Sequence, residues 1–182
     1  MSNAFQRVAK AIATDLSGLS SSEVETLIGL FRKSQPLLLL PNHSITVDYS
    51  ASVEQLVEAG KYGWSNDDIT SHNFPSFERG TAQVVVYLVN FNSDISSEDV
   101  IRELDRQGLR PATLKELLTL GVAQPDLQCK NRIVALDSTW RDFLGWVYVP
   151  FLDSSGGLYR YLGLHCRDDD WRLGCQFAAV RK

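Results

Sequence analysis

The sequence contains little cysteine. Among 182 residues, only Cys129, Cys166 and Cys175 carry a thiol. An odd number of cysteines argues against a disulfide framework. One bridge, between Cys166 and Cys175, would require the last two predicted strands to pair, whereas reduced and buried thiols are the simpler expectation. Reduced thiols are typical of the cytoplasm, so we expect a cytoplasmic location.

A long apolar run and an excess of basic charge are also absent. The leucine run at 37–40 ends at Pro41, far short of the roughly 20 apolar residues that a membrane-spanning helix needs. Lysine and arginine number 18 against 22 acidic residues, which gives a net charge of −4. Acidic residues are interleaved with the basic ones, so no footprint for nucleic acid is indicated. We expect neither a membrane nor a nucleic acid as partner, and the sequence leaves the oligomeric state open.

Several motifs of cofactor and nucleophile chemistry are missing. The sequence has no Gly-x-Gly-x-x-Gly turn, no phosphate loop and no Gly-x-Ser-x-Gly elbow. Its three histidines, His43, His72 and His165, are widely spaced. We therefore predict no cofactor and no metal, and we expect a non-catalytic function rather than an enzyme.

What the sequence does contain is a mixed succession of elements over residues 82–182. The stretch 82–92 is apolar on both alternating faces, which is typical of a strand covered on both sides. Helices are predicted at 96–107 and 113–120, because each opens at a capping residue and carries an apolar stripe. Strand-like segments bounded by turn residues follow at 133–140, 145–152, 158–166 and 173–181. This order indicates an α+β fold.

The N-terminal third is predicted to be mainly helical. Apolar residues recur with helical spacing over 5–16 and 24–31, and a shorter helix that follows a capping box ends near Gly60. Residues 62–76 are rich in Asn, Asp, Ser and Thr, as loops are. We therefore divide the chain into a helical N-terminal region at 1–60, a loop or linker at 61–81, and an α+β domain at 82–182.

The helix pair of the α+β segment resembles a known family. Its first helix ends at Gly108 and is followed by Arg110, Pro111 and the capping pair Thr113 and Glu116. This pattern resembles the paired-helix region of the formylglycine-generating-enzyme-like branch of the C-type-lectin fold. The order of the later strands and a terminal Phe-x-x-Val-Arg strand agree with the resemblance. It implies a C-type-lectin-like domain with two helices and a twisted antiparallel sheet.

The functional motifs of that fold do not accompany the resemblance. The Glu-Pro-Asn and Gln-Pro-Asp triplets of calcium-dependent lectins are absent, and the nearest Trp-Asn-Asp match, at 64–67, is interrupted. Beyond Cys166 and Cys175, nothing is similar to the reactive cysteine site of formylglycine-generating enzymes, and the multi-histidine iron site of the sulfoxide synthases is missing. A second resemblance, to small bacterial proteins of unknown function, implies no activity and is carried by residues 64–69, 110–118 and 133–136.

Aromatic side chains are dense in the last third of the chain. Trp140 and Trp171 lie at predicted loop edges beside charged residues, where an exposed aromatic side chain suits a binding surface. Core packing is the other interpretation of both tryptophans. Our first hypothesis is a non-catalytic binding module that holds a protein or small-molecule ligand through loops at 138–142 and 167–172. Its candidate binding residues are Trp140, Arg141, Asp142, Asp170, Trp171 and Arg172.

An enzyme is the alternative hypothesis. His165 and Cys166 are neighbours in a predicted strand and would point to opposite faces, whereas Cys175 meets His165 if their strands pair. The run Asp168–Asp170 offers oxygen ligands for Ca²⁺ or Mg²⁺, but it lacks the glycine of calcium loops. A metal- or thiol-dependent enzyme would use the region of Cys166, Cys175, His165 and Asp168–Asp170.

Overall fold

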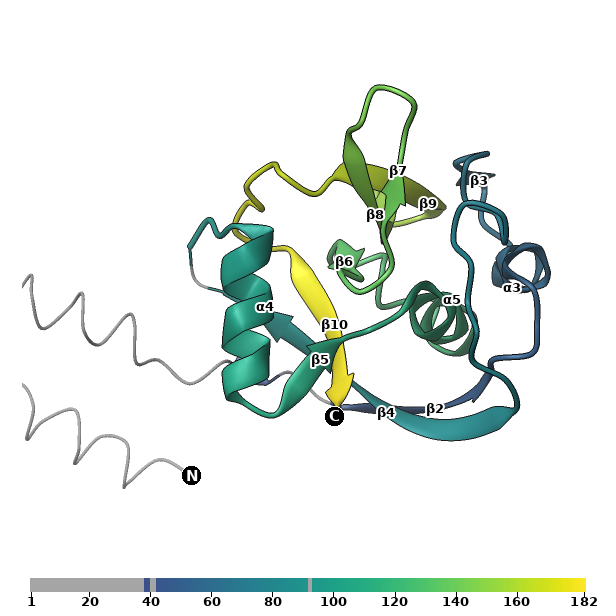
Figure 1. Cartoon of the computed structure of the whole chain (residues 1–182), viewed down its shortest axis with the longest axis horizontal. Helices are drawn as coiled ribbons and strands as arrows, with labels where there is room; N and C mark the ends of the chain where they lie inside the picture. The colour runs from purple at the N-terminus through teal and green to yellow at the C-terminus, as the bar shows by residue number, and fades with distance from the viewer. Residues whose placement is uncertain (1–37, 40–41, 92) are drawn as a thin grey trace, which may run out of the picture. The chain divides into compact units, whose positions relative to one another are not determined.

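The computed structural model describes residues 38–39, 42–91 and 93–182 (Figure 1). The helices expected at 5–16 and 24–31 lie outside these residues. The described residues form three helices and a sheet of ten strands. In chain order the elements are β1 (Leu38–Leu39), β2 (His43–Asp48), α3 (Val53–Gly60), β3 (Trp64–Ser65), β4 (Thr81–Asn90), α4 (Ser97–Arg106), β5 (Leu109–Pro111), α5 (Leu114–Ala123), β6 (Ile133–Val134), β7 (Trp140–Arg141), β8 (Val147–Ser155), β9 (Tyr159–Cys166) and β10 (Gln176–Arg181).

The sheet is mixed. Its strand order is β1-β4-β10-β6-β8-β9-β3, and β2, β5 and β7 pair beside this path with β4, β10 and β8. Most neighbours are antiparallel, but β10 with β6 and β3 with β9 are parallel. The expected α+β class is confirmed, while the expectation of an antiparallel sheet is wrong for these two pairs. Strands β10 and β6 are parallel because β8 and β9 form a hairpin on one side of β6. The chain then crosses over, and β10 runs along β6 in the same direction.

The central strands β4 and β10 are covered on both faces, as the apolar alternation predicts. On one face, Val86 and Leu88 are buried in a cluster with apolar residues of α3 and α5. We call this the helix-pair face. On the other, Val89 and Phe177 are buried with Val100 of α4, and we call it the α4 face. Helices α4 and α5 lie on opposite sides of β10 in Figure 1.

The helix starts follow the predicted caps. The capping boxes that begin with Ser52 and Thr113 are both formed, and Ser96 caps α4. Helix α5 runs on to Ala123 instead of stopping near Gly121. A Cβ at Gly121 would lie 2.5 Å from the Tyr62 hydroxyl, so this glycine makes room for a packed ring and does not end the helix.

Residues 43–60 contribute to the same core as residues 82–182. β2 pairs with β4 along its whole length, and α3 packs against α5. The following loop is anchored to α3, because the amide and hydroxyl of Ser71 each donate to Glu54 over 2.7 Å. In the described part of the chain, no helix combines the length and the apolar composition needed to cross a membrane.

Candidate ligand-binding cavity

A cavity of ≈ 670 Å³ opens on the sheet side that carries the α4 face. Its wall combines the residue before β6, the end of β8, part of β9 and the loop that leads into β10. Its chemically active lining residues are Arg132, Asp153, His165, Trp171, Arg172 and Cys175. The volume falls in the range of about 300–1,000 Å³ that is typical of small-molecule sites.

A guanidinium is fixed on the wall of this cavity. Nε of Arg132 donates to Oδ2 of Asp153 over 2.8 Å, and its guanidinium carbon lies 4.4 Å from the ring centre of Phe151. The hydroxyl of Tyr161 donates to the same oxygen over 3.0 Å, and the amide of Ser154 donates to the other oxygen over 2.7 Å. Both oxygens of the carboxylate are therefore engaged. Within the described residues, Nε is the one guanidinium atom of Arg132 with a hydrogen bond of good geometry, and the side chain of Tyr161 also lies close to the guanidinium.

The charge states of this cluster follow from its surroundings. Partial burial works to lower the pKa of Arg132, but the hydrogen bond and charge of Asp153 outweigh it, and the pKa is raised. Burial, followed by the hydrogen bond to Asp153, raises the pKa of Tyr161. The cavity therefore contains a permanent cation beside a phenol that keeps its proton.

His165 and Cys175 also line the cavity, and both are held in their neutral forms. The ring of His165 lies 4.8 Å from that of Trp171 between centroids, and its Nε2 is 3.6 Å from Oδ2 of Asp169. Burial, helped by the charge of Arg132, lowers the pKa of His165. Burial also raises the pKa of the Cys175 thiol. Because the thiolate is the nucleophilic form, this environment does not activate the cysteine.

Trp171 corrects one expectation. It is not an exposed aromatic side chain at a loop edge but is 1% exposed in the α4 face. Its indole N–H donates to Oγ of Ser97 over 2.8 Å, and the Ser97 hydroxyl donates to the carbonyl of Arg167 over 2.7 Å. An isolated bridge between Ile95 and Trp171 brings the polar Asp-Asp-Asp-Trp-Arg stretch against the start of α4. Asp170 and Arg172, which flank Trp171 in the sequence, are exposed and line the cavity.

The other predicted binding loop lies elsewhere. Trp140, Arg141 and Asp142 are not among the cavity-lining residues but shape the hairpin between β7 and β8. Oδ1 of Asp142 accepts hydrogen bonds from two amides across the turn, those of Leu144 and Trp146, both at 2.9 Å. This hairpin presents Phe143, which is 95% exposed. These three residues are therefore not part of the cavity wall, although the two predicted loops flank the start of β8, where Arg141 pairs with Val147 and the Val147 carbonyl accepts a hydrogen bond from the amide of Arg167.

The residues of the enzyme hypothesis are brought together only in part. His165 and Cys175 share the cavity, whereas Cys166 is not among its lining residues. The three cysteines are free, and β9 does not pair with β10, so the condition for a bridge between Cys166 and Cys175 is not met. Asp168–Asp170 are exposed after β9. In the described ranges, no three His, Cys, Asp or Glu side chains are placed to hold a metal ion.

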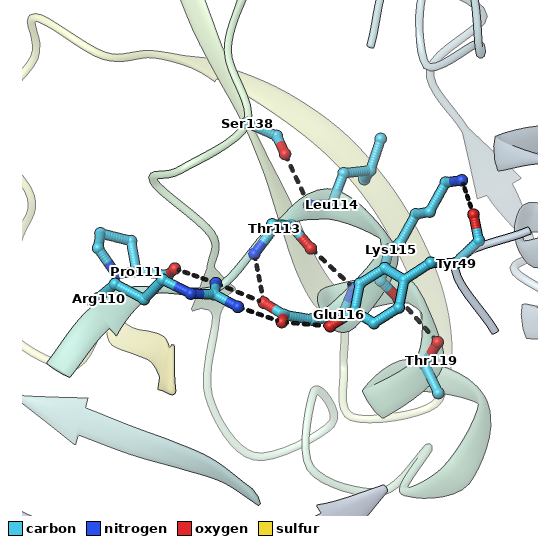
Figure 2. A network of polar contacts seen from close by, with 9 residues as sticks. All are labelled: Tyr49, Arg110, Pro111, Thr113, Leu114, Lys115, Glu116, Thr119 and Ser138. Carbon is cyan, nitrogen blue, oxygen red and sulfur yellow. Dashed lines mark hydrogen bonds and ion pairs between the residues drawn. The ribbon is translucent and has the colours of Figure 1, made fainter. Parts of the chain in front are cut away.

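A second polar cluster, on the helix-pair face, is fully occupied by its own contacts (Figure 2). Glu116 is 0% exposed and accepts hydrogen bonds from Arg110 at 2.7 and 3.0 Å, from the Tyr49 hydroxyl at 2.7 Å and from the Thr113 amide at 2.7 Å. Burial works to raise the pKa of Glu116, but these hydrogen bonds outweigh it and lower the pKa. The capping role predicted for Thr113 is therefore confirmed, and Arg110 supplies the counter-charge of Glu116.

The cavity's central residues were not predicted as a site. Arg132 precedes a strand of two residues, and its contact with Asp153 depends on the register of β6 with β8. Asp153 and Tyr161 are directly opposite each other in β8 and β9, which period-two alternation would reveal only once the hairpin register is known. No protein-family model, curated protein or solved structure matches the chain.

Proposed function

We propose that the β-rich C-terminal part is a non-catalytic binding module that holds a small molecule in the cavity beside Arg132. The observation that carries this proposal is the guanidinium of Arg132, which Asp153 fixes through Nε while its two Nη atoms make no hydrogen bond of good geometry within the described chain. The loop from Asp170 to Cys175 supplies part of the cavity wall, in agreement with one of the two loops expected from the sequence.

Three features support binding over catalysis. The thiol of Cys175 and the imidazole of His165 are both shifted toward their neutral forms by burial. The carboxylate of Asp153 is engaged by three donors and is not free to act as a base. A nucleophile with an adjacent, oriented base is what covalent catalysis needs, and these contacts do not supply one.

The C-type-lectin-like arrangement belongs to the same proposal. The succession of β4, α4, α5 and later strands agrees with it, and so does a site formed by loops on a rigid sheet. The module would act in the cytoplasm, where free thiols are the normal state. A protein ligand at the β7–β8 hairpin is the other form of the binding hypothesis.

The test is an NMR screen with neutral, cationic and anionic fragments against the whole chain labelled with ¹⁵N. We expect saturable shifts in the amide signals of Gly157, Leu173, Gly174 and Cys175, which surround the cavity. Signals of the β7–β8 hairpin serve as an internal reference and should stay in place. If no fragment moves the cavity signals, or if all shifts fall elsewhere, the proposal is wrong.

A thiol-dependent enzyme is the second candidate, because His165 and Cys175 share one cavity. The reaction rate of Cys175 with iodoacetamide distinguishes it from the binding module. With its pKa raised by burial, the thiol should react slowly at pH 7 and faster as the pH rises above 9. Fast alkylation at pH 7 that is lost in a Cys175→Ser variant would favour the enzyme.

A further inference from the structure

Four arginines in the described residues are partly buried, and three of them differ in how their donors are used; the fourth, Arg167, has a buried Nε without a partner. Arg110 directs both Nη atoms to Glu116. Arg160 directs Nε to Gln128, and its two Nη atoms to the carbonyls that end α3 and line α5. Arg132 uses only Nε, although its side chain is 32% exposed, as much as that of Arg110. The Nη atoms of Arg132 are not among the buried side-chain atoms that lack a partner in the described residues, so they reach solvent and are accessible to a partner from outside the chain.

The charges around the cavity indicate what this partner is. Its lining contains three cationic side chains, Lys130, Arg132 and Arg172, against two carboxylates, Asp153 and Asp170. One of these carboxylates, Asp153, already accepts hydrogen bonds on both oxygens. Cationic side chains therefore outnumber carboxylates in the lining by one, in a chain whose net charge is −4. A cationic ligand would meet the fixed guanidinium, whereas an anionic ligand is attracted by it.

We propose that the small molecule held in the cavity carries an oxyanion, a carboxylate or a phosphate group, and that the two Nη atoms of Arg132 bind it. This inference rests on the proposed function of the cavity. The planar fork of a guanidinium matches two oxygens of either group and forms paired, charge-assisted hydrogen bonds with them. Asp153 and the ring of Phe151 hold the fork in place before the ligand arrives, which reduces the ordering that binding requires.

The rest of the cavity indicates a ligand larger than a bare ion. The space of ≈ 670 Å³ extends from Arg132 to the loop that carries Arg172 and Gly174. Trp171 and the neutral ring of His165 border it as well. We therefore infer a molecule with its oxyanion at Arg132 and a polar body that reaches the exposed rim, where Arg172 provides a second positive charge.

The test uses inorganic phosphate and succinate as probes on the ¹⁵N-labelled whole chain, with sodium chloride at equal ionic strength as reference. We expect saturable shifts of the Arg132 Nε–H signal and of the Gly174 amide, with a dissociation constant of about 1–10 mM for fragments of this size. Tighter binding of phosphate than of succinate would assign the natural group as a phosphate, and the reverse order as a carboxylate.

Variants locate the anion. Arg132→Gln keeps a donor for Asp153 but loses the charge and the fork, so the affinity for either probe should fall at least tenfold. Arg132→Lys keeps the charge alone, and its affinity should fall at least threefold.

Arg102→Gln is the matched control: it removes the same charge from a side chain that is 75% exposed on α4, and should bind the probes as the original chain does. Arg172→Gln, at the exposed rim, should weaken binding two- to fivefold, and it tests the proposal even where a change at Arg132 impairs folding.

The outcomes separate the two proposals. If neutral fragments bind in the cavity while phosphate and succinate leave its signals unchanged, the binding module stands and the oxyanion inference is overturned. Unchanged affinity in both Arg132→Gln and Arg172→Gln overturns it too. If no fragment of any charge binds there, both proposals fail.

Discussion

The two faces of the sheet each contain an arginine–carboxylate pair, and the two pairs are completed differently. On the helix-pair face, Arg110 and Glu116 form a two-point contact to which Tyr49 also donates. On the side of the α4 face, Arg132 and Asp153 meet through one hydrogen bond, beside an open cavity. In the first pair the Nη donors of Arg110 are used by Glu116, whereas in the second pair the Nη donors of Arg132 are left for a ligand.

This difference separates structural from recognition chemistry within one domain. Glu116 is buried and accepts hydrogen bonds from Arg110, Thr113 and Tyr49, which fix the start of α5. These contacts leave no room for a ligand at the carboxylate. Arg132, in contrast, is anchored to Asp153 through one atom and faces solvent, so its guanidinium is held in place and can still bind a partner. The predictions below test this division, from the largest expected effect to the smallest.

Trp171→Ala should have the largest effect, because this residue closes the α4 face. Removing a fully buried tryptophan costs about 3–5 kcal/mol, and loss of the hydrogen bond to Ser97 adds about 1 kcal/mol. Urea unfolding followed by circular dichroism measures the difference. Trp146→Ala is the control: its side chain is 53% exposed, so the cost should stay below about 1 kcal/mol. Equal costs for the two variants would show that Trp171 is not a core residue.

Arg110→Ala and Arg132→Ala compare the two pairs directly. Loss of Arg110 leaves Glu116 buried without its counter-charge, so the free energy of unfolding should fall by about 3–5 kcal/mol. Loss of Arg132 leaves Asp153, 19% exposed and still bonded to two donors, at a cost of about 1–2 kcal/mol. The same urea titration measures both. A larger cost for Arg132→Ala would reverse the assignment of structural and binding roles.

The sequence predicts the Arg110–Glu116 pair much better than the Arg132–Asp153 pair. Thr113 and Glu116 are three positions apart, so their capping box is a local pattern, and Arg110 is close enough in the chain to be expected as a partner. Secondary structure that depends on such short-range contacts, including the starts of α3 and α4, was predicted correctly.

The cavity depends on contacts that no local pattern encodes. Arg132 and Asp153 are 21 positions apart and meet only through the register of β6 and β8. Trp171 and Ser97 are 74 positions apart, so the sequence left open whether this tryptophan is exposed at a binding surface or packed in the core. Asp170 and Arg172, which were assigned to a binding loop, line the cavity, but the ligand chemistry proposed for it follows from Arg132, which the sequence did not single out.

His165 should make stability fall modestly on acidification. Its pKa is lowered in the folded chain by burial and by Arg132, with Asp169 opposing, so the unfolded chain binds the proton more readily. Stability therefore rises with pH up to about 6.5 and is lost as the pH falls below that value toward the folded-state pKa. His165→Gln should flatten this dependence by less than about 1 kcal/mol between pH 7.5 and pH 5. Urea midpoints at three pH values measure it; an unchanged slope would show that other groups with a lowered pKa, among them His43, account for the dependence.

Phe143→Ala should have the smallest effect, because the β7–β8 hairpin is shaped by the contacts of Arg141 and Asp142 with its backbone and not by the side chain at its tip. Asp142 accepts two amide hydrogen bonds, and Arg141 donates to the carbonyl of Gly145 over 2.6 Å, all independent of the phenyl ring. With a side chain that is 95% exposed, the change in unfolding free energy should lie within about 0.5 kcal/mol, and phosphate affinity at the cavity should be unchanged. Phe151→Ala, at a ring that is 7% exposed beneath Arg132, is the counterpart: it should cost about 3–5 kcal/mol and disturb the cavity signals. If Phe143→Ala weakened phosphate binding instead, the hairpin and the cavity would be parts of one site, and the separation between them would have to be abandoned.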